Sequence, residues 1–358
     1  MTGVIPEGEG RLVDYCGHPS GLTVTTIFLP TRDGLLTVAK RYGGWKGRVH
    51  LEGNDCWAIA LDPSRSEHVY CGTYGRGLWQ SFDGCETWRQ ISLELSSDRI
   101  LSLAVSPLDG SIWTGTEPSA LHCSEDLGKS WHELSALRQL PSAPTWSYPP
   151  RPYTSHVRCI VLDPNDPERV LAGIEQGGVM RSLDRGKSWE DHNPAAEKDP
   201  HTMTMHPTAP GRIYEAGGGG YAESFDGGGT WSRSEEGIRQ RYLFGLAVDP
   251  GDPETIVVSA SPSPFRAHNP VVAYCTVYRR VAGETWKEAR EGLPGPHFER
   301  VFVMAAHDAE PHVFYLSTHS AELFRSTDAG KSWDQIFAQW PSGYSPQDVH
   351  GIAVAEVQ

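Results

Sequence analysis

An eight-residue pattern, S-x-D-x-G-x-[ST]-W, recurs with small changes along almost the whole chain and restricts its fold more than any other feature. Five good copies span residues 81–88, 124–131, 182–189, 224–231 and 326–333. A sixth copy, residues 279–286, keeps the glycine, threonine and tryptophan, and a seventh, residues 39–45, keeps little more than the tryptophan. Self-similarity of this kind indicates a repeat architecture.

Each fixed position of the pattern suits a tight connection between two strands. The aspartate can accept hydrogen bonds from N–H groups of the turn, and the glycine supplies the positive φ that the turn needs. The tryptophan begins the next strand and can bury about 150–250 Å² against a neighbouring sheet. We therefore predict that the repeated aspartates and tryptophans are structural.

The tryptophans that close the copies give the period of the repeat. They lie at positions 45, 88, 131, 189, 231, 286 and 333, so successive copies are 43, 43, 58, 42, 55 and 47 residues apart. A period of about 43 residues suits a four-stranded antiparallel blade. The seven tryptophans therefore predict an all-β fold, a seven-bladed β-propeller formed by a single domain over residues 1–358.

Apolar segments that end in a turn are predicted to form the inner strands of the blades. The first is Trp57–Pro63, and the remaining strands of its blade are predicted at residues 68–73, 77–82 and 88–91. Residues 348–355 have the character of an inner strand with no blade after it, whereas the N-terminal segment lacks one. We expect the C-terminal strand to join the N-terminal blade, because closure removes exposed sheet edges. Further inner strands are predicted at residues 101–107, 158–164, 201–207, 244–250 and 302–307.

The repeated octapeptides resemble the Asp-box (BNR) repeats of sialidases, sortilin-type receptors, xyloglucan-cleaving glycosidases and photosystem assembly factors. The resemblance implies a β-propeller in which the box is structural and lies on the face away from the active site. It does not imply sialidase activity itself, because the chain lacks the R-I-P signature of sialidases and their catalytic residues have no one-to-one match here.

Composition excludes several classes of function. A net charge of −14 argues against nucleic acid as the main partner, and the absence of an 18-residue apolar run argues against a membrane span. The N-terminus has no basic segment followed by an apolar core, so no signal peptide is expected. The seven cysteines are odd in number and include no CxxC, which fits reduced thiols and a cytoplasmic location.

Two periods are longer than the others because of insertions at residues 134–155 and 261–271. The first follows a fourth strand and the second follows a second strand, so both are expected on the face opposite the repeated turns. They are either proline-rich surface loops or the walls of a pocket over one end of the central channel.

Aligning the inner strands on their turns predicts a polar ring at one end of the channel. Such a ring is either a solvated channel mouth or a ligand pocket with convergent polar groups. One position of the alignment holds Trp57, Leu101, Arg158, His201, Phe244, Phe302 and His350, and the position two residues earlier holds Asp55, Arg99, His156, Asp199, Tyr242, Arg300 and Asp348. The loops between second and third strands add Tyr74, Arg76, Glu117, Glu175, Gln176, Tyr221, Arg266, His268, His319 and Glu322.

One hypothesis for this ring is an enzyme or binder of a small anionic or glycosidic ligand, because guanidinium groups suit carboxylates and paired carboxyl groups suit glycoside hydrolysis. The candidate acid–base or nucleophilic residues are Glu117, Glu175, Tyr242 and Asp55. The candidate ligand-binding residues are Arg99, Arg158, Arg300, Tyr74, Arg76, Trp146, His268 and His319. Trp146 either stacks on a ligand or fixes its own insertion to the rim.

Two further hypotheses stay open. His156, His201 and His350, with Asp55 or Glu175 nearby, could hold Zn²⁺, Mn²⁺ or Fe²⁺ in a metal-dependent lyase or hydrolase, although no HxxxH motif is present. Alternatively the chain is a non-enzymatic scaffold that binds a protein partner through its rim.

Overall fold

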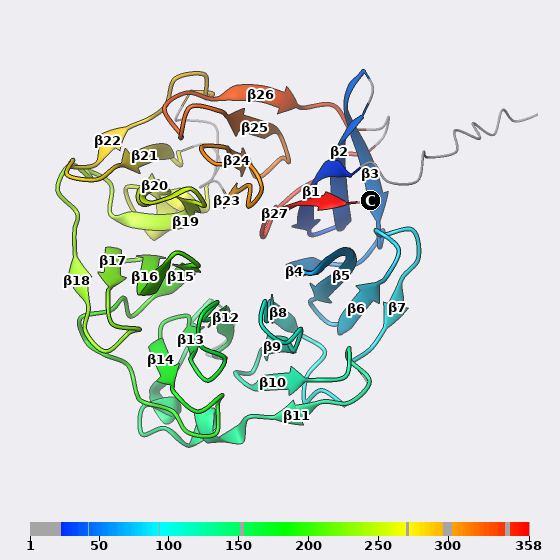
Figure 1. The fold of residues 1–358 in the computed structure, drawn as a ribbon, viewed down its shortest axis with the longest axis vertical. Helices are drawn as coiled ribbons and strands as arrows, with labels where there is room; N and C mark the ends of the chain where they lie inside the picture. The colour runs from blue at the N-terminus through cyan, green and yellow to red at the C-terminus, as the bar shows by residue number, and fades with distance from the viewer. Residues whose placement is uncertain are drawn as a thin grey trace, which may run out of the picture.

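Seven antiparallel sheets stand around a central channel, as the sequence predicts (Figure 1). The structure is a computed structural model that describes residues 23–41, 43–92, 94–150, 154–269, 272–295, 303–340 and 344–357. Within these residues, six sheets have four strands and one has three. We number the sheets as blades 1 to 7 in chain order. The fold is therefore a seven-bladed β-propeller. No helix in the described part of the chain has the length and apolar character needed to cross a membrane.

The strands of each blade run in order from the channel to the rim. Blade 1 contains β27 (Ala353–Val357), β1 (Val24–Thr31), β2 (Gly34–Arg41) and β3 (Gly44–His50). Blade 2 contains β4 (Cys56–Asp62), β5 (Arg65–Thr73), β6 (Leu78–Ser81) and β7 (Arg89–Gln90). Blade 3 contains β8 (Ile100–Val105), β9 (Ile112–Thr116), β10 (Leu121–Ser124) and β11 (His132–Glu133). Blade 4 contains β12 (Val157–Leu162), β13 (Val170–Ile174) and β14 (Gly178–Ser182), with a single bridge between Arg181 and Glu190 in the fourth position.

The last three blades repeat this arrangement. Blade 5 contains β15 (Pro200–His206), β16 (Ala209–Gly217), β17 (Gly220–Ser224) and β18 (Ser232–Arg233). Blade 6 contains β19 (Tyr242–Asp249), β20 (Asp252–Ser261), β21 (Thr276–Arg280) and β22 (Lys287–Glu288). Blade 7 contains β23 (Val303–Ala306), β24 (Phe314–Ser317), β25 (Leu323–Ser326) and β26 (Asp334–Phe337).

The C-terminal strand closes the ring. β27 pairs with β1 from Val24–Val357 to Phe28–Ala353, so the two ends of the described chain share blade 1. The predicted strand, residues 348–355, begins too early, because Val349 makes only an isolated bridge with Thr31 and the regular ladder starts at Ala353. Closure itself is confirmed.

Each of the five good octapeptides forms the same hydrogen-bonded turn. In the copy at residues 182–189, Ser188 N donates to Asp184 Oδ1 (2.8 Å), Ser188 Oγ donates to Asp184 Oδ2 (2.6 Å), and Gly186 N donates to Ser182 Oγ (2.7 Å). Two successive residues, Arg185 and Gly186, have φ of 60° and 80°. In the copy at residues 81–88 the glycine position holds Cys85, which takes a φ of 77°. The hydrogen bonds of the aspartate therefore define the turn even where the glycine is missing.

Replacing one of these aspartates should weaken the fold in a pH-dependent way. Backbone and side-chain hydrogen bonds from Thr230 lower the pKa of Asp226 to about 2. Because the folded pKa is depressed, the stabilisation is complete above about pH 4 and is lost as the pH falls towards 2. We expect Asp226→Ala to lower the free energy of unfolding by about 1 kcal/mol at pH 7, and by less at pH 3, in urea titrations. An equal loss at both pH values would contradict this account.

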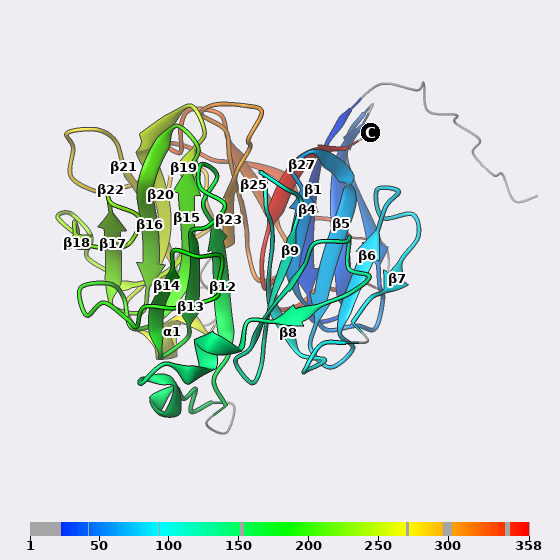
Figure 2. The ribbon, with the colours of Figure 1, turned by 60° about the horizontal axis from the view of Figure 1, so that its bottom comes forward.

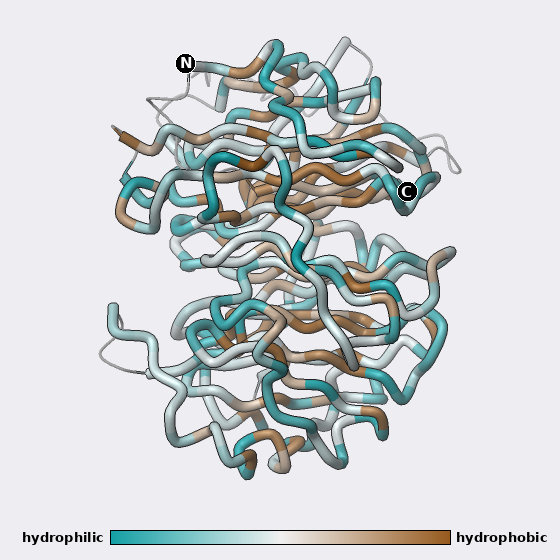
Figure 3. Tube along the Cα trace, turned by 90° about the vertical axis from the view of Figure 1, so that its left-hand side faces the viewer, coloured by the Kyte–Doolittle hydropathy of each residue, from teal (hydrophilic) through white to brown (hydrophobic). Residues whose placement is uncertain are grey.

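The hydrophobic core lies between neighbouring blades. Tyr70 of blade 2 packs with Ile112 of blade 3, and similar clusters fill the other interfaces. Second strands such as β9 and β13 are buried on both faces, whereas the inner strand β4 alternates between buried and partly exposed residues because one side faces the channel. Figure 3 shows the apolar segments along the middle of the blades, with polar residues towards the loops. The loops at the channel ends are therefore where polar side chains can gather.

The described parts of both insertions lie on the same face of the ring (Figure 2). The first carries two short 3-10 helices, η1 (Ser135–Gln139) and η2 (Ala143–Thr145), and the second carries α1 (Pro264–Ala267). The repeated octapeptide turns join third and fourth strands, so they lie at the opposite ends of the blades. One end of the channel is thus structurally distinct from the other.

Candidate functional site

A cavity of about 430 Å³ lies at the end of the channel where the insertions stand. Tyr148 of the first insertion and His268 of the second both line this cavity. The lining residues come from blades 1, 2, 4, 6 and 7 and from the first insertion. They are Arg32, Asp55, Trp57, Tyr74, Tyr148, His156, Arg158, Glu175, Phe244, His268, His319, Asp348, Val349 and His350.

Irregular strand pairing turns a set of side chains towards this cavity. At the entrance of each of five inner strands the register with the second strand shifts, and the shift lies at Cys56/Ala58, Ile100/Ser102, Val157/Cys159, Pro200/Thr202 and Leu243/Leu246. The extra residues at these bulges include those at one position of the predicted ring. Trp57, Arg158 and Phe244 among them line the cavity, whereas His201 is buried and does not line it. A β-bulge breaks the regular alternation of side chains and re-aims the bulged residue. The β-bulges therefore help to orient the side chains of the ring, and the sequence alignment does not reveal these bulges.

His156, Arg158 and Glu175 form a charged cluster on the blade 4 side of the cavity. His156 Nε2 donates to Glu175 Oε2 (2.7 Å), and Arg158 Nε lies 3.9 Å from the same oxygen. Burial alone would raise the pKa of Glu175, but the hydrogen bond from His156 and the charge of Arg158 outweigh it and lower the pKa to about 2. Glu175 is therefore a carboxylate at neutral pH.

Glu117, a predicted catalytic residue, lies behind the wall of the cavity. Its side chain is only 1 % exposed and accepts hydrogen bonds from Tyr74 Oη (2.8 Å) and Arg99 Nη1 (3.4 Å). His156 Nδ1 lies 3.6 Å from its second oxygen. Arg99 also stacks over the Tyr74 ring. Glu117 and Arg99 thus position Tyr74 and His156, and neither lines the cavity.

Tyr242, one of the predicted acid–base or nucleophilic residues, is also buried. Its hydroxyl is hydrogen-bonded to His268 Nε2 (3.0 Å), and its ring lies 4.8 Å from that of His201. Burial raises the pKa of the Tyr242 phenol, so the hydroxyl stays protonated at neutral pH. This position supports the orientation of His268 and His201 and does not suit a nucleophile.

Asp55 and His350 face each other across the blade 1–blade 2 side of the cavity. His350 Nε2 lies 3.5 Å from Asp55 Oδ1, and the imidazole stacks on Trp57 with 3.9 Å between the ring centroids. Burial lowers the pKa of His350, although Asp55 opposes the shift. Trp57 and Tyr74, with ring centroids 5.9 Å apart, form an aromatic wall beside this pair.

Of the remaining predicted binding residues, some line the cavity and others lie outside it. His268 and His319 line the cavity, whereas Arg76 is exposed outside it. Trp146 is buried among apolar residues of the first insertion and blade 4, and its Nε1 donates to Ser142 Oγ (2.9 Å), so it anchors the insertion instead of facing a ligand. Arg300 lies outside the described residues. Arg32 and Val349 also line the cavity, although no sequence pattern marks either of them.

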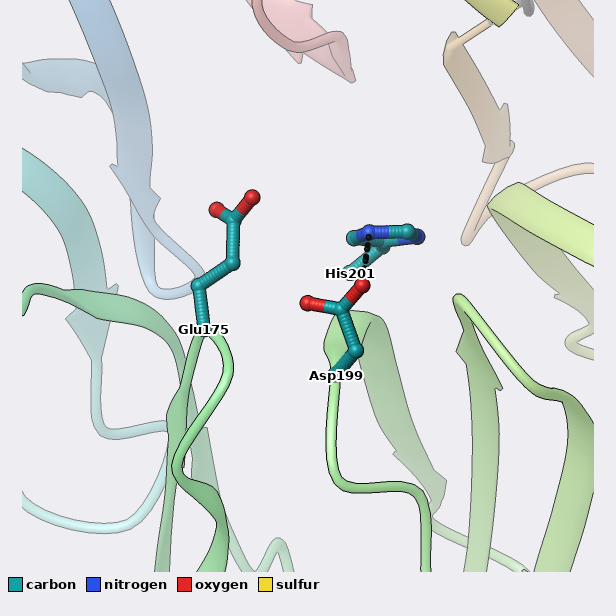
Figure 4. Close-up of side chains that lie close together, drawn as sticks. All are labelled: Glu175, Asp199 and His201. Atoms are coloured by element: carbon teal, nitrogen blue, oxygen red, sulfur yellow. Dashed lines mark ion pairs between the residues drawn. The ribbon is translucent and has the colours of Figure 1, made fainter. Parts of the chain in front are cut away.

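The three predicted metal ligands do not form one group. His156 is bound to Glu175, and His350 is paired with Asp55 on another wall. In the described part of the chain, the group whose ligand atoms lie within 4.8 Å of one another is Glu175, Asp199 and His201 (Figure 4). His201 Nε2 lies 3.5 Å from Asp199 Oδ2. Burial would lower the pKa of His201, but Asp199 raises it above the usual value.

Solved structures that share this architecture fall into two groups. An ancestral GH74 enzyme and the GH74 enzyme of Niastella koreensis both align with TM-scores of 0.64 and 16% identity over 88% of this chain. The alignments cover 40% and 54% of those enzymes, so this chain spans about half of their length. YCF48 bound to a D1 peptide aligns with a TM-score of 0.59 and 17% identity, covering 93% of this chain and 96% of that chain.

These likenesses define the class of protein but no family. At such identities they show the fold alone, a β-propeller like those of the GH74 enzymes and YCF48. No protein-family model and no curated sequence matches the chain. The chemistry of the axial cavity must therefore carry the functional argument.

Proposed function

We propose that the protein binds a small hydroxylated carboxylate, such as an acidic sugar, in the axial cavity. The observation that carries this proposal is the position of Arg158. Its guanidinium lies over the Phe244 ring, 5.2 Å from the centroid, and lines the cavity. In the described part of the chain its Nε has no hydrogen-bond partner, and its one ion-pair contact, to Glu175, is long at 3.9 Å. A ligand carboxylate would supply the missing acceptors.

The other walls suit the rest of such a ligand. Trp57 and Tyr74 offer aromatic faces on which a sugar ring can stack. His268 and His319 add polar groups that can meet hydroxyls, and ionised Glu175 can accept a hydrogen bond from them. The GH74 enzymes with the same fold are consistent with a carbohydrate ligand.

Replacing Arg158 tests this proposal. We expect the wild-type chain to bind glucuronate or a related acidic sugar more tightly than glucose in calorimetric titrations. Arg158→Gln should weaken binding of the acidic sugar about 10- to 100-fold, because a charged hydrogen bond contributes roughly 1.5–3 kcal/mol. Arg76→Gln is the matched control, since Arg76 lies on the same face but outside the cavity wall. Equal affinity for neutral sugars, or unchanged binding by the Arg158 variant, would refute the proposal.

A second candidate is a scaffold that binds a peptide segment of a partner protein. The peptide-bound YCF48 structure supports it, because that chain and this one match over almost their full lengths. Phe265, on α1 beside His268, is 78 % exposed and offers an apolar contact at the edge of the cavity. Peptides selected for binding to the wild-type chain that fail to bind Phe265→Ala, yet still bind Arg158→Gln, would favour the scaffold over the sugar-binding function.

A further inference from the structure

We propose that Glu175, Asp199 and His201 form a binding site for a divalent transition-metal ion at the edge of the axial cavity. Glu175 follows β13 in blade 4, whereas Asp199 and His201 lie at the start of β15 in blade 5 (Figure 4). Their ligand atoms lie within 4.8 Å of one another. The site goes beyond the proposed sugar-binding function and does not depend on it.

His201 has the environment of a metal ligand. The residue is only 3 % exposed, and its Nδ1 donates a hydrogen bond to the carbonyl oxygen of Leu243 (2.6 Å). In a neutral ring this bond places the lone pair on Nε2. In the described part of the chain Nε2 is buried without a hydrogen-bond partner. It lies 3.5 Å from Asp199 Oδ2, and Glu175 belongs to the same group of ligand atoms within 4.8 Å. Metal-binding histidines are oriented by just such a bond from their other nitrogen.

The two carboxylates are also held by neighbours outside the group. Gln176 N donates to Asp199 Oδ1 (3.3 Å), and His156 Nε2 donates to Glu175 Oε2 (2.7 Å). These contacts leave Asp199 Oδ2 and Glu175 Oε1 as the oxygens for an ion. Partners of this kind fix ligand orientation in metal sites. His201 Nε2, which lies 3.5 Å from Asp199 Oδ2, is therefore the centre of a supported cluster.

The ligand set indicates which ions fit. One imidazole and two carboxylates suit Zn²⁺ or Mn²⁺, and their two negative charges balance a divalent ion. Zn²⁺ holds such ligands at about 2.0–2.2 Å, so the three ligand atoms, which lie within 4.8 Å of one another, would close around a bound ion. Glu175 also lines the cavity, so an ion here would be accessible to a ligand in it.

Metal titration of the untagged full-length chain tests this site without any organic ligand. After treatment with a chelator and dialysis, the wild-type chain should bind one equivalent of Zn²⁺ or Mn²⁺ in calorimetry and in equilibrium dialysis with elemental analysis. Asp199→Asn should reduce the affinity at least tenfold. Glu175→Gln provides a second variant if the first does not fold, and thermal melts report folding for both.

His350→Gln is the matched control. His350 has a carboxylate, Asp55, at the same 3.5 Å separation on another wall of the cavity. We expect this variant to bind the ion as the wild-type chain does. Failure of the wild-type chain to bind either ion, unchanged binding by folded Asp199 and Glu175 variants, or an equal loss in His350→Gln would overturn the proposed ligand set. Because no sugar is present, these outcomes are independent of the Arg158 experiment.

Discussion

Truncating the chain after Ile352, which removes β27, should prevent formation of a stable ring. β27 supplies five residue pairs to β1, and Glu356 Oε1 accepts hydrogen bonds from Thr25 Oγ1 (2.6 Å) and from His307 of the neighbouring blade (3.0 Å). Ser66 of blade 2 donates to the Glu356 carbonyl. Losing about five net hydrogen bonds at roughly 1 kcal/mol each, together with the buried Val357, approaches the 5–15 kcal/mol that usually stabilises a domain. We expect an insoluble chain, or a large fall in the urea midpoint.

A peptide of residues 347–358 provides the control for the truncation. If the loss comes from the open edge of β1, adding this peptide in excess should restore solubility and raise the midpoint, because it supplies the missing strand. A scrambled peptide of the same composition should not. A truncated chain with the wild-type urea midpoint would show that blade 1 does not need its inner strand.

The fold could be predicted because its information is local. Each octapeptide carries the acceptors that close its own turn, as the bonds to Asp184 show, and the spacing of the tryptophans gives the number of blades. The start of β27 was misplaced because residues 348–352 have strand-like composition, yet only Val349 forms a bridge. A strand begins where its neighbouring strand can pair with it, and for β27 that neighbour is β1, at the other end of the sequence.

The candidate site was predictable only in part, because the path of the backbone at the strand entrances is not visible in the sequence. Alignment placed Arg158 and His350 at the channel mouth, and both line the cavity. It also placed Glu117 and Tyr242 there, but both turn into the wall and bind neighbouring side chains. The histidines were grouped by their ring position, whereas the structure pairs each with the nearest carboxylate. Residues at equivalent positions of the inner strands therefore differ in whether their side chains face the cavity or the wall.

Replacing Glu223 should cause a large loss of stability, because two arginines bind this buried carboxylate. This carboxylate, on β17, is bound by Arg280 Nη2 (2.8 Å) and Arg212 Nη2 (3.3 Å) between blades 5 and 6. Burial would raise the pKa of Glu223, but the hydrogen bond and charge of Arg280 outweigh it and lower the pKa. Glu223→Gln leaves the buried Arg280 guanidinium without its counter-charge, whereas Arg212 keeps its ion pair with Glu254. The substitution should therefore cost about 3–5 kcal/mol in urea unfolding at pH 7. Because the folded pKa is depressed, the wild-type advantage should shrink as the pH falls below about 4.5. A loss below 1 kcal/mol would refute this role.

Glu215, on β16 of the same blade, is the matched control for Glu223. Replacing Glu215 by glutamine should raise the stability of the protein at high pH, whereas replacing Glu223 should lower it. It is fully buried, and one of its oxygens has no hydrogen-bond partner in the described part of the chain. Arg233, whose charge partly opposes the shift of the Glu215 pKa, forms its ion pair with Glu197 (2.8 Å). Burial raises the pKa of Glu215 well above its usual value, and the charge of Glu197 adds to the shift. The folded chain therefore holds a proton that the unfolded chain releases, so wild-type stability falls as the pH rises above about 4.5. Glu215→Gln should remove this loss and make the protein more stable than wild type at pH 8, by about 1.4 kcal/mol for each unit of pKa difference between the two states. Destabilisation at pH 8 would show that Glu215 has a counter-charge after all.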